Sequence, residues 1–181
     1  MPSKRFWAKN NPELDFKETV TKTNFFIDNY KYKKFIHISS VSARCQLNTV
    51  YGKNKKKSED LVAQDSNNLI LRLGPLYGEG LKKGVLIDMV NSKTVFINGN
   101  SKYSFTNINW VCEWIISKMN IHKGIKEIGS QDYLTLSDIA KKIKSKSKFE
   151  GEIDDQIILD NEIYDSKSFN VYDYLKNFQL N

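Results

Sequence analysis

The stretch Lys34-Phe-Ile-His-Ile-Ser39 is a short apolar run that ends in small polar residues, a pattern that predicts a buried β-strand. Residues 51–64 contain no proline, and nothing after Gly52 breaks a helix, so a helix is expected there. A second buried strand is predicted over Asn68-Leu-Ile-Leu-Arg-Leu-Gly74, where Gly74-Pro75 ends it. Strand, helix and strand at this spacing form a βαβ unit, which requires a parallel sheet.

The rest of the chain predicts further helices and short strands around this unit. Apolar residues at helical spacing predict helices over 15–30, 85–91, 110–119 and 135–145, with a last one near 171–178. Thr135 and Asp138 have the spacing of an N-terminal helix cap. Strands are predicted over 125–128, and over 94–97 and 103–108 on either side of the turn Asn98-Gly99-Asn100. The predicted fold class is therefore α/β.

The composition is that of a globular protein with one domain, or one domain and a small appendage. The chain has 181 residues, of which 40% are apolar, so it can bury a sizeable core. No apolar run approaches the roughly 18 residues of a membrane helix, and no secretory signal is visible at the N-terminus. Cys45 and Cys112 are too few for a disulfide framework, so a cytoplasmic location is expected.

The net charge of +7 arises in the first third of the chain, where residues 1–60 hold 13 basic and 6 acidic side chains. A basic region is one mark of a nucleic-acid binder. However, 25 Lys stand against only 3 Arg, and Arg is the side chain that reads phosphates and guanines with two hydrogen bonds. We therefore expect no nucleic-acid partner, and we interpret the run Lys53–Lys57 as a solvated helix face.

A tyrosine followed four residues later by a lysine is a pair with chemical meaning. On a helix the two side chains share a face, and an ammonium beside a phenol favours the phenolate. The sequence contains three such pairs, Tyr30–Lys34, Tyr51–Lys55 and Tyr172–Lys176. Only Tyr51–Lys55 begins a helix between two buried strands, and parallel sheets bind ligands at the carboxyl ends of their strands. Ser40 and Gly74 are expected at those ends.

Three blocks follow one another along the chain. They are Phe35-Ile-His-Ile-Ser-Ser-Val-Ser42, Tyr51-Gly-Lys-Asn-Lys-Lys-Lys-Ser-Glu-Asp-Leu61 and Leu69-Ile-Leu-Arg-Leu-Gly-Pro-Leu-Tyr-Gly-Glu-Gly80. In this order they resemble the extended short-chain dehydrogenases/reductases, the NAD(P)-dependent sugar-nucleotide epimerases, dehydratases and reductases. The resemblance implies the C-terminal part of a Rossmann-like parallel sheet with a small α/β portion of a substrate domain. Residues 1–75 would form the partial NAD(P)-binding region, and residues 76–181 mainly a substrate-binding segment.

The same resemblance implies roles for individual residues. Tyr51 would be the general acid/base. Lys55 would bind the nicotinamide ribose and lower the pKa of the tyrosine. Ser40 would bind the substrate oxygen. The nicotinamide would lie against Gly74, Pro75 and Leu76, and the remaining substrate contacts would come from Tyr77 and Lys102. The implied reaction is hydride transfer between NAD or NADP and a carbon of a sugar or nucleotide-sugar.

The glycines depart from the family pattern. None of the nine precedes the Tyr51 helix, and neither G-x-G-x-x-G nor G-x-x-G-x-x-G occurs, although this motif holds the cofactor pyrophosphate at a helix N-terminus. The chain is therefore expected to be a truncated frame, one half of a split enzyme, or a remnant with a new role, and to bind NAD(P) weakly or not at all by itself.

Alternatives and partners follow from this departure. A non-catalytic binding or scaffold protein is the main alternative to an enzyme. The strand over 34–39 is expected to have an open edge, which a homodimer or a partner chain would cover, or else a rearranged N-terminal segment over 4–14. No metal site is expected, because the two histidines, His37 and His122, and the two cysteines are far apart in the sequence.

Overall fold

The computed structural model describes residues 5–159 and 170–177. The chain divides into two compact units, Met1–Leu73 with Ile116–Glu127, and Gly74–Ile115 with Ile128–Asn181. These units are defined by packing, and the functional division of the chain at residue 75 stays a prediction.

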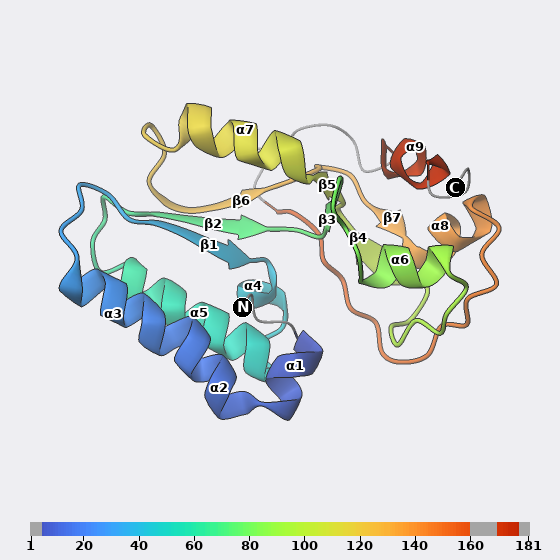
Figure 1. Cartoon of the computed structure of the whole chain (residues 1–181), viewed down its shortest axis with the longest axis horizontal. Coiled ribbons are helices and arrows are strands. Elements are labelled where there is room, and N and C mark those ends of the chain that lie inside the picture. Colours follow the sequence, from blue (N-terminus) through green and yellow to red (C-terminus); the bar gives the residue numbers. More distant parts are fainter. Residues whose placement is uncertain (1–4, 160–169, 178–181) are drawn as a thin grey trace. The chain divides into compact units, whose positions relative to one another are not determined.

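The first unit contains a three-stranded sheet of β1 (Ile36–Ser40), β2 (Leu69–Leu73) and β6 (Gly124–Ile128), in the order β1-β2-β6 (Figure 1). β1 and β2 are parallel, with Ile36 opposite Leu69 and Ser40 opposite Leu73. The start of β6 lies beside the start of β2, because the Gly124 N–H donates to the Asn68 carbonyl at 2.8 Å. The predicted α/β class, with a parallel sheet of Rossmann-like type, is confirmed.

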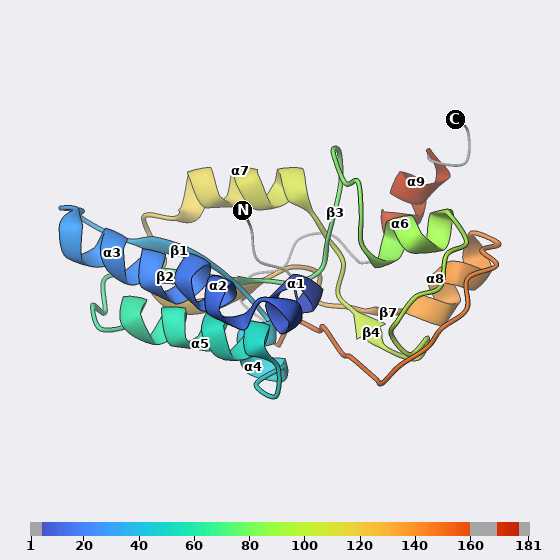
Figure 2. The same ribbon diagram turned by 60° about the horizontal axis from the view of Figure 1, so that its bottom comes forward.

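Helices cover one face of this sheet. α5 (Val50–Val62) joins β1 to β2, and α1 (Arg5–Asn10), α2 (Pro12–Phe16) and α3 (Lys22–Asn29) precede β1. α2 and α3 run beside α5 in both views (Figure 1, Figure 2). The single helix predicted over 15–30 is present but interrupted, since Lys17–Thr21 forms a turn of π-helix, η1.

A buried ionic network ties α5 to all three strands. Each strand contributes its penultimate residue: Ser39 from β1, Arg72 from β2 and Glu127 from β6. The fully buried Glu59 of α5 accepts hydrogen bonds from Ser39 Oγ (2.6 Å), Arg72 Nε (2.9 Å) and Arg72 Nη2 (2.7 Å). Glu127 lies 3.6 Å from Arg72 Nη1 and takes two hydrogen bonds from Arg44, at 2.6 and 3.0 Å. Arg44 and Arg72, two of the chain's three arginines, belong to this network.

One edge of the sheet is open within the described residues. β1 pairs with β2 on one side and with no described strand on the other. The expected homodimer or partner chain at this edge stays a prediction. No helix in the described part of the chain has the length and apolar character that crossing a membrane requires.

In its described residues, the second unit has two short strand pairs and four helices around its own core. β3 (Leu76–Tyr77) is parallel to β5 (Thr106–Asn107), and β4 (Lys102–Tyr103) is antiparallel to β7 (Leu134–Thr135). The helices are α6 (Val85–Val90), α7 (Ile108–Lys118, which continues into the first unit), α8 (Leu136–Lys142) and α9 (Val171–Lys176). Thr135 caps α8 as predicted, because its Oγ1 accepts from the Asp138 N–H at 3.1 Å.

The predicted strand pair over 94–97 and 103–108 is wrong. Val95 makes only an isolated bridge to Phe149, while Tyr103 pairs with Leu134 and Thr106 with Leu76. The carbonyls at the turn are taken by the first N–H groups of α8, Ser137 to Gly99 (2.8 Å) and Leu136 to Ser101 (3.2 Å). The local turn pattern predicted a hairpin, but these residues instead pair with segments that are distant in the sequence.

Gly52 sets how closely α5 approaches α4 (Ser42–Cys45), the short helix after β1. A Cβ at position 52 would lie 2.1 Å from the Gln46 carbonyl oxygen and 2.7 Å from that of Ser42. Both atoms belong to backbone, which cannot move aside as a side chain can. Only glycine fits this contact.

Gly52→Ala should therefore destabilise the chain by about 1–3 kcal/mol, through overpacking, although Ala normally favours a helix over Gly. Urea unfolding followed by circular dichroism measures this. The matched control is Lys53→Ala, an exposed neighbour on α5, which should stay within about 0.5 kcal/mol of the parent. A Gly52→Ala variant as stable as the parent would contradict the close contact.

Candidate active site

Tyr51 and Lys55 lie on one face of α5, as their spacing predicted. The helix begins after Thr49, whose Oγ1 accepts a hydrogen bond from the Gly52 N–H at 3.0 Å. Tyr51 is thus in the first turn and Lys55 one turn later. The Lys55 ammonium lies 5.9 Å from the centroid of the Tyr51 ring. The phenol and the ammonium are close enough to interact electrostatically.

The Lys55 side chain is half-buried. Burial lowers the pKa of its ammonium, and the charges of Asp15 and then Glu59 oppose that shift. Within residues 5–159 and 170–177, no hydrogen bond or ion pair reaches Lys55 Nζ. A desolvated ammonium of this kind retains three N–H donors for a ligand.

Ser40 and Ser39 have different surroundings at the end of β1. Ser39 is buried and donates to Glu59. Ser40 is half-buried, and its Oγ accepts from the Ser42 N–H at 3.2 Å. Because α4 begins at Ser42 and packs against Gly52, this turn connects Ser40 to the first turn of α5. Of the two serines, Ser40 is the one whose hydroxyl is not bound to Glu59.

His37 is a residue of β1, and its side chain contacts α5. Its Nε2 lies 2.9 Å from Ser58 Oγ, and that hydroxyl donates to the Lys55 carbonyl at 2.8 Å. Since the hydroxyl has one proton, which it donates to the Lys55 carbonyl, Nε2 is the donor in the first contact. Burial, and then the charge of Lys55, lower the pKa of His37 to about 4.

Gly74, Pro75 and Leu76 belong to the second unit. A Cβ at Gly74 would lie 3.0 Å from the Ser104 carbonyl oxygen, so the chain passes closely there. The Pro75 carbonyl accepts from the Thr106 N–H at 2.8 Å, and Leu76 is half-buried in β3. Their contact with a nicotinamide ring stays a prediction.

Tyr77 and Lys102, the predicted substrate residues of the second unit, are held by their neighbours. Tyr77 is buried in the core, with its ring centroid 5.5 Å from that of Tyr174. The Lys102 ammonium lies 4.9 Å from the centroid of the Tyr133 ring. Tyr77 contributes to packing, and a role of either residue in substrate binding stays a prediction.

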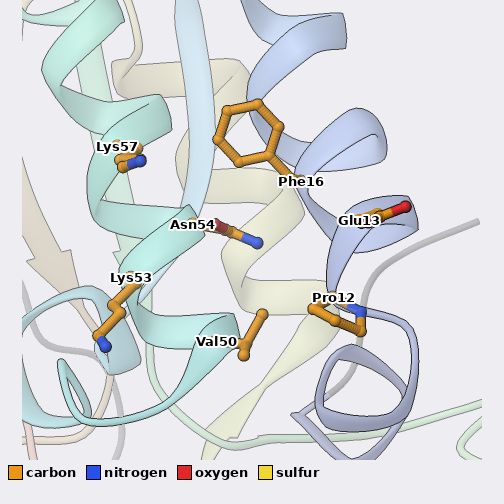
Figure 3. Close-up of a pocket in the computed structure, with 7 residues that line it drawn as sticks. All are labelled: Pro12, Glu13, Phe16, Val50, Lys53, Asn54 and Lys57. Atoms are coloured by element: carbon orange, nitrogen blue, oxygen red, sulfur yellow. The ribbon is translucent and has the colours of Figure 1, made fainter.

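A groove of about 400 Å³ lies between α2 and α5 (Figure 3). Its floor is apolar, and Lys53 and Lys57 stand beside it on α5; the lining residues are Pro12, Glu13, Phe16, Val50, Lys53, Asn54 and Lys57. None of these is a predicted site residue. The groove follows a different stripe of α5 from Tyr51 and Lys55, because residues three and four apart share a helix face.

Sequence reasoning missed Asp15 and Glu59, two buried carboxylates whose charges act on Lys55. Asp15 stands near the start of a helix and Glu59 among polar residues, so both patterns are typical of surface positions. One signal was available. Arg72 interrupts the apolar run Leu69-Ile-Leu-Arg-Leu, and a buried strand that contains an arginine requires a carboxylate nearby.

The solved structures similar to this chain include three nucleotide-sugar epimerases. They are the UDP-glucuronic acid 4-epimerase of Bacillus cereus (TM-score 0.76, 19% identity, 99% of this chain and 73% of that one), the UDP-N-acetylglucosamine 4-epimerase of Methanobrevibacter ruminantium (0.74, 12%, 97% and 72%) and the UDP-glucose 4-epimerase of Thermotoga maritima (0.72, 16%, 86% and 64%). The first was solved with UDP-glucuronic acid and NAD. No protein-family model and no curated protein matches the sequence.

These similarities define the fold. The chain shares the backbone fold of part of each of these structures and spans 64% of the length of the Thermotoga maritima protein. At identities of 12–19% the shared property is the backbone arrangement. The Rossmann-like fold implied by the resemblance in the sequence is thus confirmed, and the reaction is a separate question.

The neutral state of His37 predicts how stability depends on pH. Its pKa is about 4 in the folded chain and about 6.5 when unfolded. The unfolded state therefore binds more protons between these values, and stability is lost as the pH falls from about 6.5 to about 4. The loss should reach at most about 3.4 kcal/mol.

Denaturant unfolding across this pH range measures the effect, and His37→Gln should flatten the curve. A proton NMR titration of His37 gives a direct check, with a midpoint near 4 expected. A midpoint near the ordinary histidine value would show that the ring is not desolvated.

Proposed function

We propose that this chain acts in the NAD(P)-dependent epimerisation, dehydration or reduction of a nucleotide-sugar, and that its first unit supplies the acid/base and ribose-binding residues. The observation that carries the proposal is the Tyr51–Lys55 pair. Its ammonium is desolvated, has no bound partner in the described residues, and lies 5.9 Å from the phenol ring centroid. The likeness of the fold to NAD-bound epimerases supports it.

The proposed roles follow from the chemistry of each side chain. Tyr51 takes a proton from a sugar hydroxyl as the carbon is oxidised and returns it on reduction, as a general acid/base does. Lys55 favours the phenolate through its charge and donates to the ribose hydroxyls. Ser40 donates to the same substrate oxygen and orients it toward Tyr51. NAD(P), when bound, supplies the acceptor and donor of hydride.

The residues present fit one end of such a cofactor. The three N–H donors of the Lys55 ammonium suit the hydroxyls of a ribose diol. No glycine-rich turn of dinucleotide-binding type occurs among the 181 residues, so the pyrophosphate lacks its usual binding site in this sequence. We accordingly propose a nicotinamide-end site with weak affinity for the whole dinucleotide. A cytoplasmic location and a partner at the β1 edge remain part of the proposal.

NADH and NADPH should bind the purified chain with a Kd no tighter than about 1 mM, because the pyrophosphate contacts are missing. Saturation-transfer NMR detects binding in this range. Lys55→Met should abolish the signal from the nicotinamide ribose, whereas Lys53→Met, an exposed lysine on the same helix, should leave it. Low-micromolar binding, or equal losses in both variants, would contradict this assignment.

Turnover gives the second test, on this chain alone and after fusion to a glycine-rich dinucleotide-binding half. Tyr51→Phe should lower the conversion of UDP-sugars by about 10²–10⁴-fold while cofactor affinity changes little, because phenylalanine keeps the ring and loses the proton. Undiminished turnover would exclude Tyr51 as the acid/base. If no fusion is active although NADH binds, the non-catalytic alternative is the correct one.

A further inference from the structure

Two fully buried carboxylates act on the Lys55 ammonium. Glu59 lies one turn beyond Lys55 on α5, and Asp15 lies on α2, which packs against α5. Each has 0% exposed surface. Buried charges are screened far less than those in water, so their fields reach neighbouring groups. These two acids are the main opposition to the desolvation of Lys55.

Both carboxylates are held by donors other than Lys55. Asp15 Oδ2 accepts from Asn54 Nδ2 at 2.7 Å, and Asn54 is the residue next to Lys55 on α5. Glu59 accepts from Ser39 and twice from Arg72. The two acids therefore supply negative charge without forming an ion pair with Lys55. This differs from an ordinary buried salt bridge, in which the ammonium donors are consumed.

We infer that Asp15 and Glu59 are positioning residues that keep Lys55 charged in its desolvated place while leaving its N–H groups for the hydroxyls of a vicinal diol. The inference rests on the proposed function, since the nicotinamide ribose is such a diol. It adds two residues, from α2 and from the far turn of α5, to those that determine how the site works.

The other titratable groups around Lys55 do not supply this charge. His37, on β1, is neutral at ordinary pH because its pKa is about 4. Tyr51, one turn before Lys55 on α5, lies with its ring beside the ammonium. Asp15 on α2 and Glu59 on α5 are the acids whose charges raise the pKa of Lys55. Removing either negative charge should therefore make Lys55 easier to deprotonate.

The test is a titration of Lys55 in the full chain without any ligand. Lysine amines are labelled by reductive ¹³C-methylation, the Lys55 signal is assigned with Lys55→Arg, and its midpoint is followed by NMR. Asp15→Asn and Glu59→Gln should each lower the midpoint, and the double variant should lower it further. Both substitutions keep the shape of the side chain and one acceptor oxygen; in Glu59→Gln the second acceptor becomes an NH2 group beside donors of Ser39 or Arg72, so this variant is also expected to lose stability.

Asp60→Asn is the matched control. Asp60 is an exposed carboxylate on the same helix, paired with Lys56, so water screens its charge and the midpoint should not move. Glu127→Gln breaks the buried network away from Lys55 and should lower stability with little change in the midpoint. If Asp15 and Glu59 had only a structural role, Asp15→Asn and Glu59→Gln would lower stability and leave the Lys55 midpoint nearly unchanged, as is expected for Glu127→Gln.

Unchanged midpoints in Asp15→Asn and Glu59→Gln would overturn the inference, as would an equal shift in Asp60→Asn. If circular dichroism shows that one of these two variants does not fold, the midpoint of the other variant is the test of the inference. NADH is then added to the parent. A Lys55 signal that does not respond counts against the proposed function, whereas the ligand-free midpoints test the inference independently.

Discussion

The bidentate ion pair between Arg72 and Glu59 is the contact on which the first unit depends. It joins α5, the longer of the two helices between β1 and β2, to the middle strand of the sheet, and Ser39 and Glu127 extend it to both outer strands. Removing one partner of such a pair leaves a buried charge and typically costs about 3–5 kcal/mol. Tyr51 and Lys55 lie on the same helix as Glu59. The Arg72–Glu59 ion pair therefore also fixes the position of these two residues relative to the ends of the strands.

The distribution of charge separates two uses of basic residues. Arg44 and Arg72 are committed to buried carboxylates, where a planar fork of donors matches two oxygens. Among the lysines of the run Lys53–Lys57, the first and last are exposed and Lys55 is half-buried. One basic stretch thus contains both solvent-exposed lysines and the lysine proposed to bind the ribose. The helical periodicity determines which of these lysines face solvent.

Much of this fold could be predicted because its signals are local. The βαβ unit, the helix cap at Thr135 and the shared face of Tyr51 and Lys55 all follow from spacing within a few residues. The strand pair predicted over 94–97 and 103–108 was wrong because alternation identifies buried residues without identifying their partners, and Tyr103 pairs with Leu134, 31 residues away. Asp15 and Glu59 escaped notice for the same reason, since a carboxylate's burial depends on elements that only the folded chain brings together.

The π-helical turn η1 has a consequence for how this helix layer tolerates change in length. Such a turn holds one residue more than an α-helical turn. It acts as an insertion that sets the rotational phase of α2 relative to α3. Deleting one residue between Lys17 and Thr21 would restore a regular helix and rotate Asp15 by about 100° about the helix axis, away from Asn54. The charge beside Lys55 thus depends on the length of a segment that contains none of the site's residues.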